Sequence, residues 1–187
     1  MYDTLRSLEE KQHGEYSMRL ILNTYKAFVE AVIPWTPRLA AQYGEVQYYG
    51  AIDALTYEYV ILTLYELGGN ALLIATGEAL DAAAKELVYQ GGNEVSIDTT
   101  QGVTFSALAP GDRLSVIKRI KKQEILSLGD PMISDKYMID SLIRFTMMGY
   151  YSEWYGYGST RLDEPNQRIL EFQPNSWRQV DYPGPVR

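Results

Sequence analysis

Carboxylates are the side chains of this 187-residue sequence best suited to acid–base or metal chemistry. The pairs that stand out are Glu58 with Glu66, Glu78 with Asp81, and Asp135 with Asp140. The first two pairs can each share one face of a helix, as the paired acids of glycosidases and di-iron bundles do. The Glu-x-x-His pairs of a di-iron site are absent, so solvated helix faces and caps are the favoured interpretation. A stand-alone enzyme that works through Glu58, Glu78 and Asp81 remains an alternative.

Other nucleophilic and metal-binding groups are scarce. The sequence has no cysteine, which excludes thiolate nucleophiles, disulfides, and thiolate zinc or iron–sulfur sites. The single histidine, His13, lies in a polar stretch without companion ligands, and we expect it to be an ordinary surface residue. Neither of the glycine-rich phosphate loops, G-x-G-x-x-G and G-x-x-x-x-G-K, is present. We therefore expect no catalytic residue, metal or nucleotide cofactor in this chain.

Aromatic residues gather near the end of the chain. Nine of them fall within residues 145–187, among glycines and prolines that prevent a long helix or a regular strand. Such rings must be covered by the rest of the chain, by another protein, or by both. Because Tyr, Trp and Arg are enriched in binding hot spots, we predict a partner-binding arm in which the rings supply area and the arginines fix orientation. The candidate residues are Tyr150, Tyr151, Trp154, Tyr155, Tyr157, Arg161, Trp177, Arg178 and Tyr182.

The composition is that of an ordinary globular protein, with 46% hydrophobic and 22% charged residues. A formal net charge of -7 argues against a general nucleic-acid binder, which would need Lys and Arg to neutralise phosphates. The first residues contain no basic patch followed by an apolar run, and no stretch is expected to reach the roughly 20 apolar residues of a membrane span. As written, the chain is expected in the cytoplasm.

Helical periodicity and strong breakers divide the chain into helices. Apolar residues follow helical spacing from 15 to 33, where prolines stop the helix. A nearly continuous apolar stretch at 51–67 predicts a buried central helix, ended by the glycine pair at 68–69. Further elements are predicted as helices at 71–89, at about 110–126 and at about 134–149, with a connection at 38–49 and a loop or hairpin arm at 93–104.

These elements predict an all-α fold, an irregular helical bundle of about five helices. The bundle would occupy residues 1–149, and an extended aromatic C-terminal arm would occupy residues 150–187. The arm would pack on the bundle, on a partner, or on both.

Three short motifs carry a family resemblance. They are the helix entry 105–113 (FSALAPGDR), the end of the last helix at 149–154 (GYYSEW), and the closing 177–184 (WRQVDYPG). Together they resemble the gluconate 2-dehydrogenase subunit 3 family, over roughly the C-terminal half of the chain. The Trp followed by Tyr-Pro-Gly is the most telling piece.

The resemblance implies a non-catalytic small subunit that binds and stabilises a flavin-dependent sugar or polyol oxidoreductase of the glucose–methanol–choline type. FAD would then be bound by the partner subunit. Members of that family often carry a twin-arginine export signal, which this sequence lacks, so a periplasmic or membrane-associated location through the complex is the alternative to the cytoplasm. A self-assembling structural protein, in which the aromatic arm binds a like subunit, is the alternative function.

Overall fold

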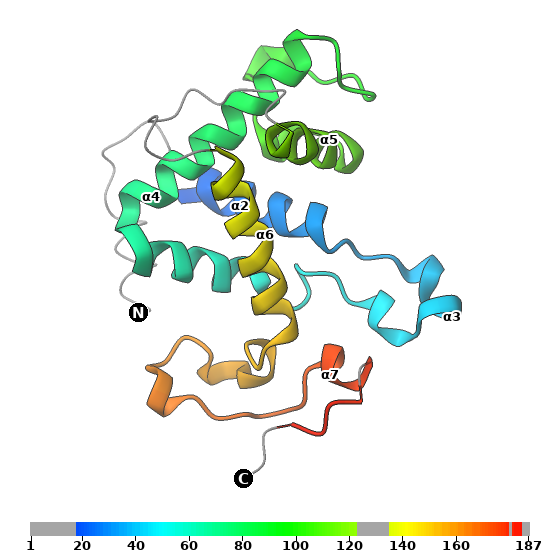
Figure 1. Ribbon diagram of the computed structural model, residues 1–187, viewed down its shortest axis with the longest axis vertical. Helices are drawn as coiled ribbons and strands as arrows, with labels where there is room; N and C mark the ends of the chain where they lie inside the picture. Colours follow the sequence, from blue (N-terminus) through cyan, green and yellow to red (C-terminus); the bar gives the residue numbers. More distant parts are fainter. Residues whose placement is uncertain (1–17, 123–134, 180, 185–187) are drawn as a thin grey trace.

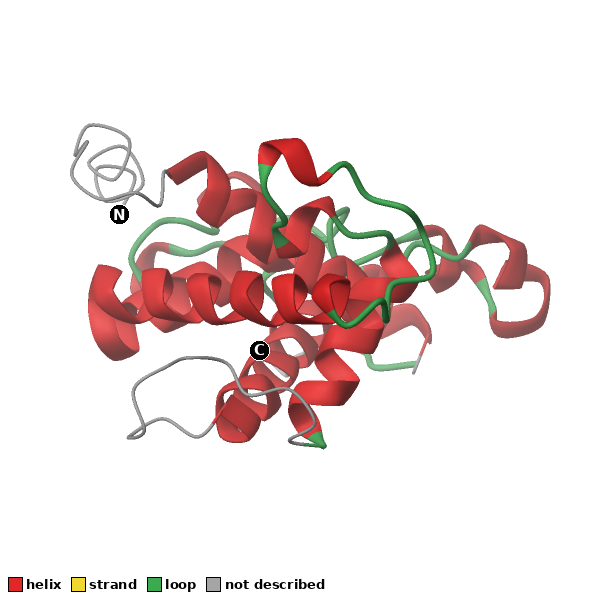
Figure 2. Cartoon of the chain, turned by 90° about the horizontal axis from the view of Figure 1, so that it is seen from above, coloured by secondary structure: helices red, strands yellow, loops and turns green. Residues whose placement is uncertain are grey.

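The computed structural model describes residues 18–122, 135–179 and 181–184, and these residues contain helices and turns but no strand. The all-α prediction is confirmed. The α-helices are α2 (Met18–Val32), α3 (Ala40–Tyr43), α4 (Thr56–Tyr89), α5 (Pro110–Lys121), α6 (Asp135–Tyr151) and α7 (Asn175–Gln179). Short 3₁₀ turns join them, as Figures 1 and 2 show. The polar start of the chain, with His13, lies outside the described residues.

Helix α4 is the long central helix, and it is bent in the middle. Gly68 and Gly69 leave helical geometry, and Gly69 has a φ of 63°, a left-handed value that favours glycine. The predicted break at this pair is therefore a kink between two limbs, which Figure 1 shows. The helix begins at Thr56 rather than at 51, because Leu55 takes a left-handed φ of 52° and ends the turn before it.

By length and apolar composition alone, α4 passes as a membrane span. The core helix of a globular domain has the same features, and α4 contributes fourteen buried residues to the packing. The kink and this burial favour the core interpretation.

The core lies where α2, α5 and α6 pack around α4. The side chains that are completely buried include Tyr25, Phe28, Ile61, Leu80, Ile120 and Leu142. The Tyr25 hydroxyl donates to the Leu73 carbonyl of α4 at 2.9 Å, which satisfies its polar end in the core. The bundle therefore has one large core cluster, and a smaller cluster of Leu62, Trp154 and Leu162 lies between α4 and the C-terminal arm.

The stretch at 93–109 is a loop with short 3₁₀ turns, which decides between the predicted loop and hairpin arm. Two buried carboxylates fix it. Asp112 accepts from the backbone N–H groups of Glu94 and Val95 at 2.8 and 3.2 Å, and Asp81 accepts from that of Phe105 at 2.8 Å. Helix α5 then begins at Pro110, as the sequence predicts, and spans Pro110–Lys121; the predicted end near 126 lies outside the described residues.

Residues 34–49, which we call the hook, project from the side of the bundle (Figures 1 and 2). The hook combines two 3₁₀ turns, Pro37–Leu39 and Glu45–Tyr48, with the single helical turn α3. Three of its rings are more than half exposed: Trp35, Tyr43 and Tyr48.

Candidate functional site

The C-terminal arm is more structured than the extended segment that the sequence suggests. Helix α6 continues two residues past Gly149, and 3₁₀ turns at Tyr155–Thr160 and Pro165–Gln167 precede the short helix α7. Gly149 lets α6 approach α4 closely, since a Cβ there would lie 2.8 Å from the Tyr59 ring. The beginning of the arm is thus a direct extension of the bundle.

Three of the nine candidate residues are anchors within this chain. Tyr150, Trp154 and Trp177 are all less than 5% exposed. The Tyr150 hydroxyl donates to the Tyr49 carbonyl at 2.7 Å, and the Trp154 indole N–H donates to the Leu55 carbonyl at 3.0 Å. The indole N–H of Trp177 donates to the Tyr151 carbonyl at 3.0 Å. Their rings therefore hold the arm on the bundle, and their assignment to a partner interface stays a prediction.

Burial alters the acidity of one of these anchors. It raises the pKa of Tyr150 to about 12, with smaller contributions from Tyr151 and Asp53. A neutral phenol that donates a hydrogen bond is therefore the stable form of Tyr150 at neutral pH.

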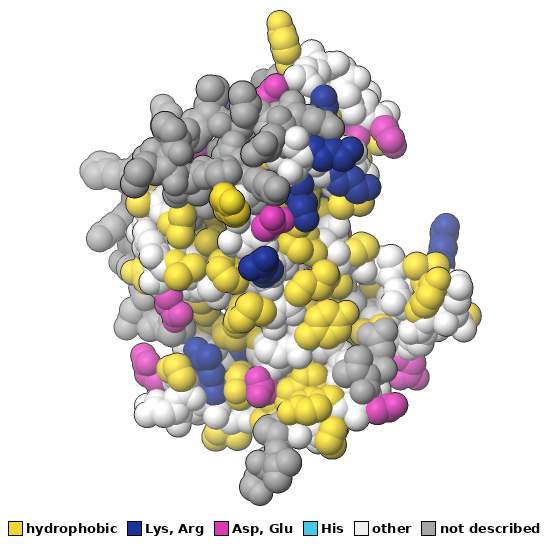
Figure 3. Space-filling model, viewed as in Figure 1, with side chains coloured by type: hydrophobic (Ala, Val, Ile, Leu, Met, Phe, Trp, Pro, Cys, Tyr) yellow, Lys and Arg dark blue, Asp and Glu magenta, His cyan; other side chains and the backbone are white. Residues whose placement is uncertain are grey.

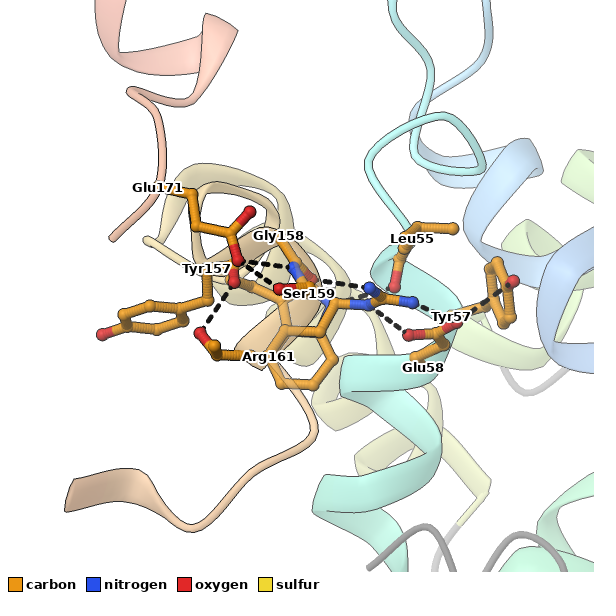
Figure 4. A network of polar contacts seen from close by, with 10 residues as sticks. Leu55, Tyr57, Glu58, Tyr157, Gly158, Ser159, Arg161 and Glu171 are labelled. Carbon is orange, nitrogen blue, oxygen red and sulfur yellow. Dashed lines mark hydrogen bonds and ion pairs between the residues drawn. The ribbon is translucent and has the colours of Figure 1, made fainter. Parts of the chain in front are cut away.

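Arg161 is a fourth anchor, shown in Figure 4. Its Nε and Nη2 donate to the two carboxylate oxygens of Glu58 at 2.7 and 3.2 Å, and its Nη1 donates to the Gly158 carbonyl at 2.7 Å. The two side chains are only 21% and 15% exposed. This bidentate pair uses the planar guanidinium as only arginine can, and it orients the arm through an internal carboxylate.

A second polar contact closes the arm on itself (Figure 4). Glu171 accepts from the backbone N–H of Ser159 at 2.9 Å and also from the Ser159 hydroxyl. These hydrogen bonds hold the pKa of Glu171 below its usual value, because they favour the ionised carboxylate.

The remaining candidate residues are more accessible. Tyr151 and Tyr182 are nearly half exposed, and Arg178 is exposed. Tyr155 and Tyr157 are partly exposed; Tyr155 packs edge-on against Phe172 with ring centroids 5.1 Å apart. Burial, followed by the nearby Glu153 carboxylate, raises the pKa of Tyr157. The arm thus contains both buried anchors and exposed rings.

A pocket of about 470 Å³ lies between the end of α6 and the turn after α7. Its lining includes Tyr151, Glu153, Trp177, Asp181, Tyr182 and Pro183, and we call it the aromatic–acidic pocket. The pocket depends on how α7 ends. The Tyr182 N–H bonds to the Trp177 carbonyl at 3.0 Å and the Asp181 N–H to that of Arg178 at 3.4 Å, the two bonds of a Schellman motif. The accompanying contact is the edge-on packing of Tyr182 against Trp177, with centroids 4.9 Å apart.

Helix α6 presents exposed aromatic, methionine and arginine side chains on the face that points away from the core. Positions 137, 144, 148 and 151 lie within about 60° of one another around a helix of 3.6 residues per turn. Their residues, Tyr137, Arg144, Met148 and Tyr151, are all exposed, and we call them the outer face of α6. Figure 3 shows hydrophobic side chains gathered over α6 and towards α7 on this side of the molecule. Sequence reasoning found only the last of the four.

The hook is a second exposed aromatic surface that sequence reasoning missed. Its signal is the same as that of the arm, because Trp35, Tyr43 and Tyr48 lie among the breakers Pro34, Pro37 and Gly44. The arm gives the stronger signal in the sequence because it contains more aromatic rings than the hook.

The structure separates the predicted carboxylate pairs. Glu58 pairs with Arg161 whereas Glu66 is exposed, and Asp81 is buried against a backbone N–H whereas Glu78 is exposed. In the part of the chain that the structure describes, no three His, Cys, Asp or Glu side chains gather closely enough to hold a metal ion. Neither of these two pairs is therefore an assembled acid–base pair in the described part of the chain.

Comparison with known proteins adds no relative: no family model, curated protein or solved structure matches this chain. The resemblance to the subunit 3 family stays a prediction from the sequence motifs.

Proposed function

We propose that this chain is a non-catalytic, partner-binding subunit, and that its partner is a flavin-dependent sugar or polyol oxidoreductase of the glucose–methanol–choline type. The observation that carries the binding role is the outer face of α6, which places two tyrosines, a methionine and an arginine together on the surface. Aromatic residues, Met and Arg are the types enriched in protein interfaces. The partner class is taken from the motifs at 105–113, 149–154 and 177–184.

The arrangement of α6 supports this role. Its inner face carries the buried residues Ile139, Leu142, Thr146 and Tyr150, which pack on the bundle. Its outer face has Tyr137 at 72% and Met148 at 55% exposed, side chains whose apolar area a partner would remove from water. One helix would thereby join the core of this chain to the partner.

The anchors of the arm support it as well. Because Trp154, Trp177 and Arg161 are held by this chain, the exposed rings beside them are presented in fixed positions before a partner binds. A rigid surface loses less conformational entropy on association than a mobile one. In this proposal the partner holds FAD and performs the chemistry.

Co-expression with an oxidoreductase of this type from the same genome tests the proposal. We expect the two chains to co-elute in size-exclusion chromatography, with flavin absorbance in the shared peak. Met148→Glu should abolish co-elution, because it places a charge within the outer face. The control is Tyr89→Glu, at a ring that is 93% exposed at the far end of α4. Separate elution of the two wild-type chains, or co-elution of the Met148→Glu variant, would refute the proposal.

Self-association through the same face is the competing function. Light scattering on the isolated chain separates the two, since the proposed subunit is a monomer until its partner is added. A dimer that Met148→Glu dissociates would replace the hetero-complex.

A further inference from the structure

The aromatic–acidic pocket has the chemistry of a cation-binding site. Tyr151 and Tyr182 contribute rings that are 47% and 46% exposed. Each of the two rings packs against a buried ring. Tyr151 lies edge-on to Tyr150 with ring centroids 5.0 Å apart, and Tyr182 lies edge-on to Trp177. The faces of aromatic rings carry partial negative charge and attract cations, so the pocket offers two fixed rings to a cationic group.

Two carboxylates complete the site. Glu153 and Asp181 both line the pocket, and among the described residues neither forms an ion pair. The partly buried carboxylate of Glu58 in α4, by contrast, is neutralised by Arg161 of the arm. The pocket therefore has aromatic rings and negative charges, both of which attract a cation. None of its described lining residues is a cation.

The backbone conformation of Asp181 also supports a binding site for a cation. Asp181 has a φ of 52° at the position of the Schellman motif that glycine commonly occupies. Aspartate adopts this left-handed conformation less readily than glycine does. In return, its carboxylate places a negative charge at the pocket wall.

We propose that the aromatic–acidic pocket binds the guanidinium group of an arginine side chain that the partner protein presents. A planar guanidinium stacks on tyrosine rings and donates two hydrogen bonds to one carboxylate, which an ammonium group cannot do. The volume lies within the range of about 300–1,000 Å³ found for small-ligand sites, which leaves room for the aliphatic stem. Tyr151 belongs to both the pocket and the outer face of α6, so an arginine seated here would lie at the edge of the same interface. The identity of the occupant as a partner residue rests on the proposed function.

A titration of the full chain with Nα-acetyl-arginine methylamide tests the site without any partner. We expect saturable shifts of the Trp177 indole signal by nuclear magnetic resonance, with a dissociation constant of about 1–10 mM, as suits a single side chain. The citrulline analogue, which has the same shape but no charge, should produce no saturation below about 100 mM, a tenfold margin in affinity. Equal binding of the two compounds, or no saturation with either, would overturn the inference.

Two variants assign the carboxylates. Glu153→Gln and Asp181→Gly should each weaken arginine binding about tenfold. Asp181→Gly should also unfold at an equal or higher urea concentration, because glycine relieves the left-handed backbone, so lost binding cannot be attributed to lost folding. Asp163→Asn, at an exposed acid outside the pocket, is the control and should bind as the wild type does. Unchanged affinity in both pocket variants would overturn the assignment.

The same variants keep this inference separate from the proposed function. If the Asp181→Gly variant binds the partner protein as tightly as the wild type does, the proposed arginine contact is wrong and the subunit role stands. If no complex forms while the arginine compound still binds, the site stands and the proposed partner is wrong.

Discussion

The loop at 93–109 and the C-terminal arm are both irregular, yet opposite kinds of hydrogen bond hold them on the bundle. In the loop, backbone N–H groups donate to the buried carboxylates of Asp81 and Asp112. In the arm, the Tyr150 hydroxyl and the Trp154 indole donate to backbone carbonyls of the bundle. Both solutions satisfy backbone groups that no regular ladder pairs.

The two regions also differ in what they leave at the surface. The loop turns its aromatic residue inward, since Phe105 is completely buried. The arm alternates buried anchors with the exposed rings of Tyr151 and Tyr182. The carboxylates that hold the loop are thus occupied by its backbone N–H groups, whereas the arm leaves two of its rings exposed. A partner could cover the exposed rings without breaking a single anchor.

The strongest test of this contrast is Asp112→Ala, in the α5 residue that holds the loop. It removes a carboxylate that is 1% exposed and leaves the backbone N–H groups of Glu94 and Val95 without their acceptor. We expect the free energy of unfolding to fall by about 3 kcal/mol, measured by urea denaturation. Asp98→Ala, at an exposed acid that caps a 3₁₀ turn, should lose less than about 1 kcal/mol. A similar loss for both would show that burial does not distinguish them.

The corresponding change in the arm is Trp154→Phe. The smaller ring keeps much of the packing against Tyr59 but removes the indole N–H that donates to the Leu55 carbonyl, which keeps only the Glu58 N–H as a donor. We expect a loss of about 2 kcal/mol from the hydrogen bond and the reduced volume. Trp35→Phe in the hook, where the ring is 62% exposed, should change stability by less than about 0.5 kcal/mol. If the two substitutions had equal effects, Trp154 would not be an anchor.

The pair of Arg161 with Glu58 gives a smaller and separable effect. A double-mutant cycle with Arg161→Met and Glu58→Gln should show a coupling of about 1.5 kcal/mol, since both partners are largely screened from solvent. Arg161→Lys should recover less than half of it, because lysine cannot form the bidentate contact. A coupling near zero would mean that the ion pair contributes nothing to docking of the arm.

The smallest effect at neutral pH is expected for Tyr150→Phe, about 1 kcal/mol for one hydrogen bond. Its pH dependence is more informative. The pKa of Tyr150 is raised from 10 to about 12 in the folded chain, so its stabilising contribution is complete below pH 10 and is lost as the pH rises towards 12. Urea midpoints between pH 9 and about 12 should therefore fall more steeply for the wild type than for the variant. Parallel curves would show that Tyr150 is not the titrating group.

Local signals in the sequence predicted much of the fold. Pro110 starts α5, Asp135 starts α6, and the glycine pair at 68–69 bends α4 where helical geometry was expected to stop. These features depend on a few neighbouring residues, so they can be derived without knowing the tertiary structure. The left-handed Leu55 has no such signal, since leucine rarely adopts that conformation and only the surrounding contacts maintain it.

The division of the arm into anchors and exposed residues was not predictable for a related reason. Trp154 and Tyr151 are large rings in the same irregular segment, and only the position of α4 decides which one is covered. The outer face of α6 was not predictable because Tyr137 lies outside the aromatic cluster, and the helical pattern of the sequence does not say which face the rest of the chain covers.

Three polar contacts of the arm converge on one short stretch of the chain, residues 49–58. The three contacts from Tyr150, Trp154 and Arg161 each span about one hundred positions of sequence and end on that stretch. They close nearly the same loop, so the entropy of closure is lost once and shared among them. During translation, residues 49–58 are therefore synthesised long before the side chains that bind them. Docking of the arm should then be one late, cooperative step of folding.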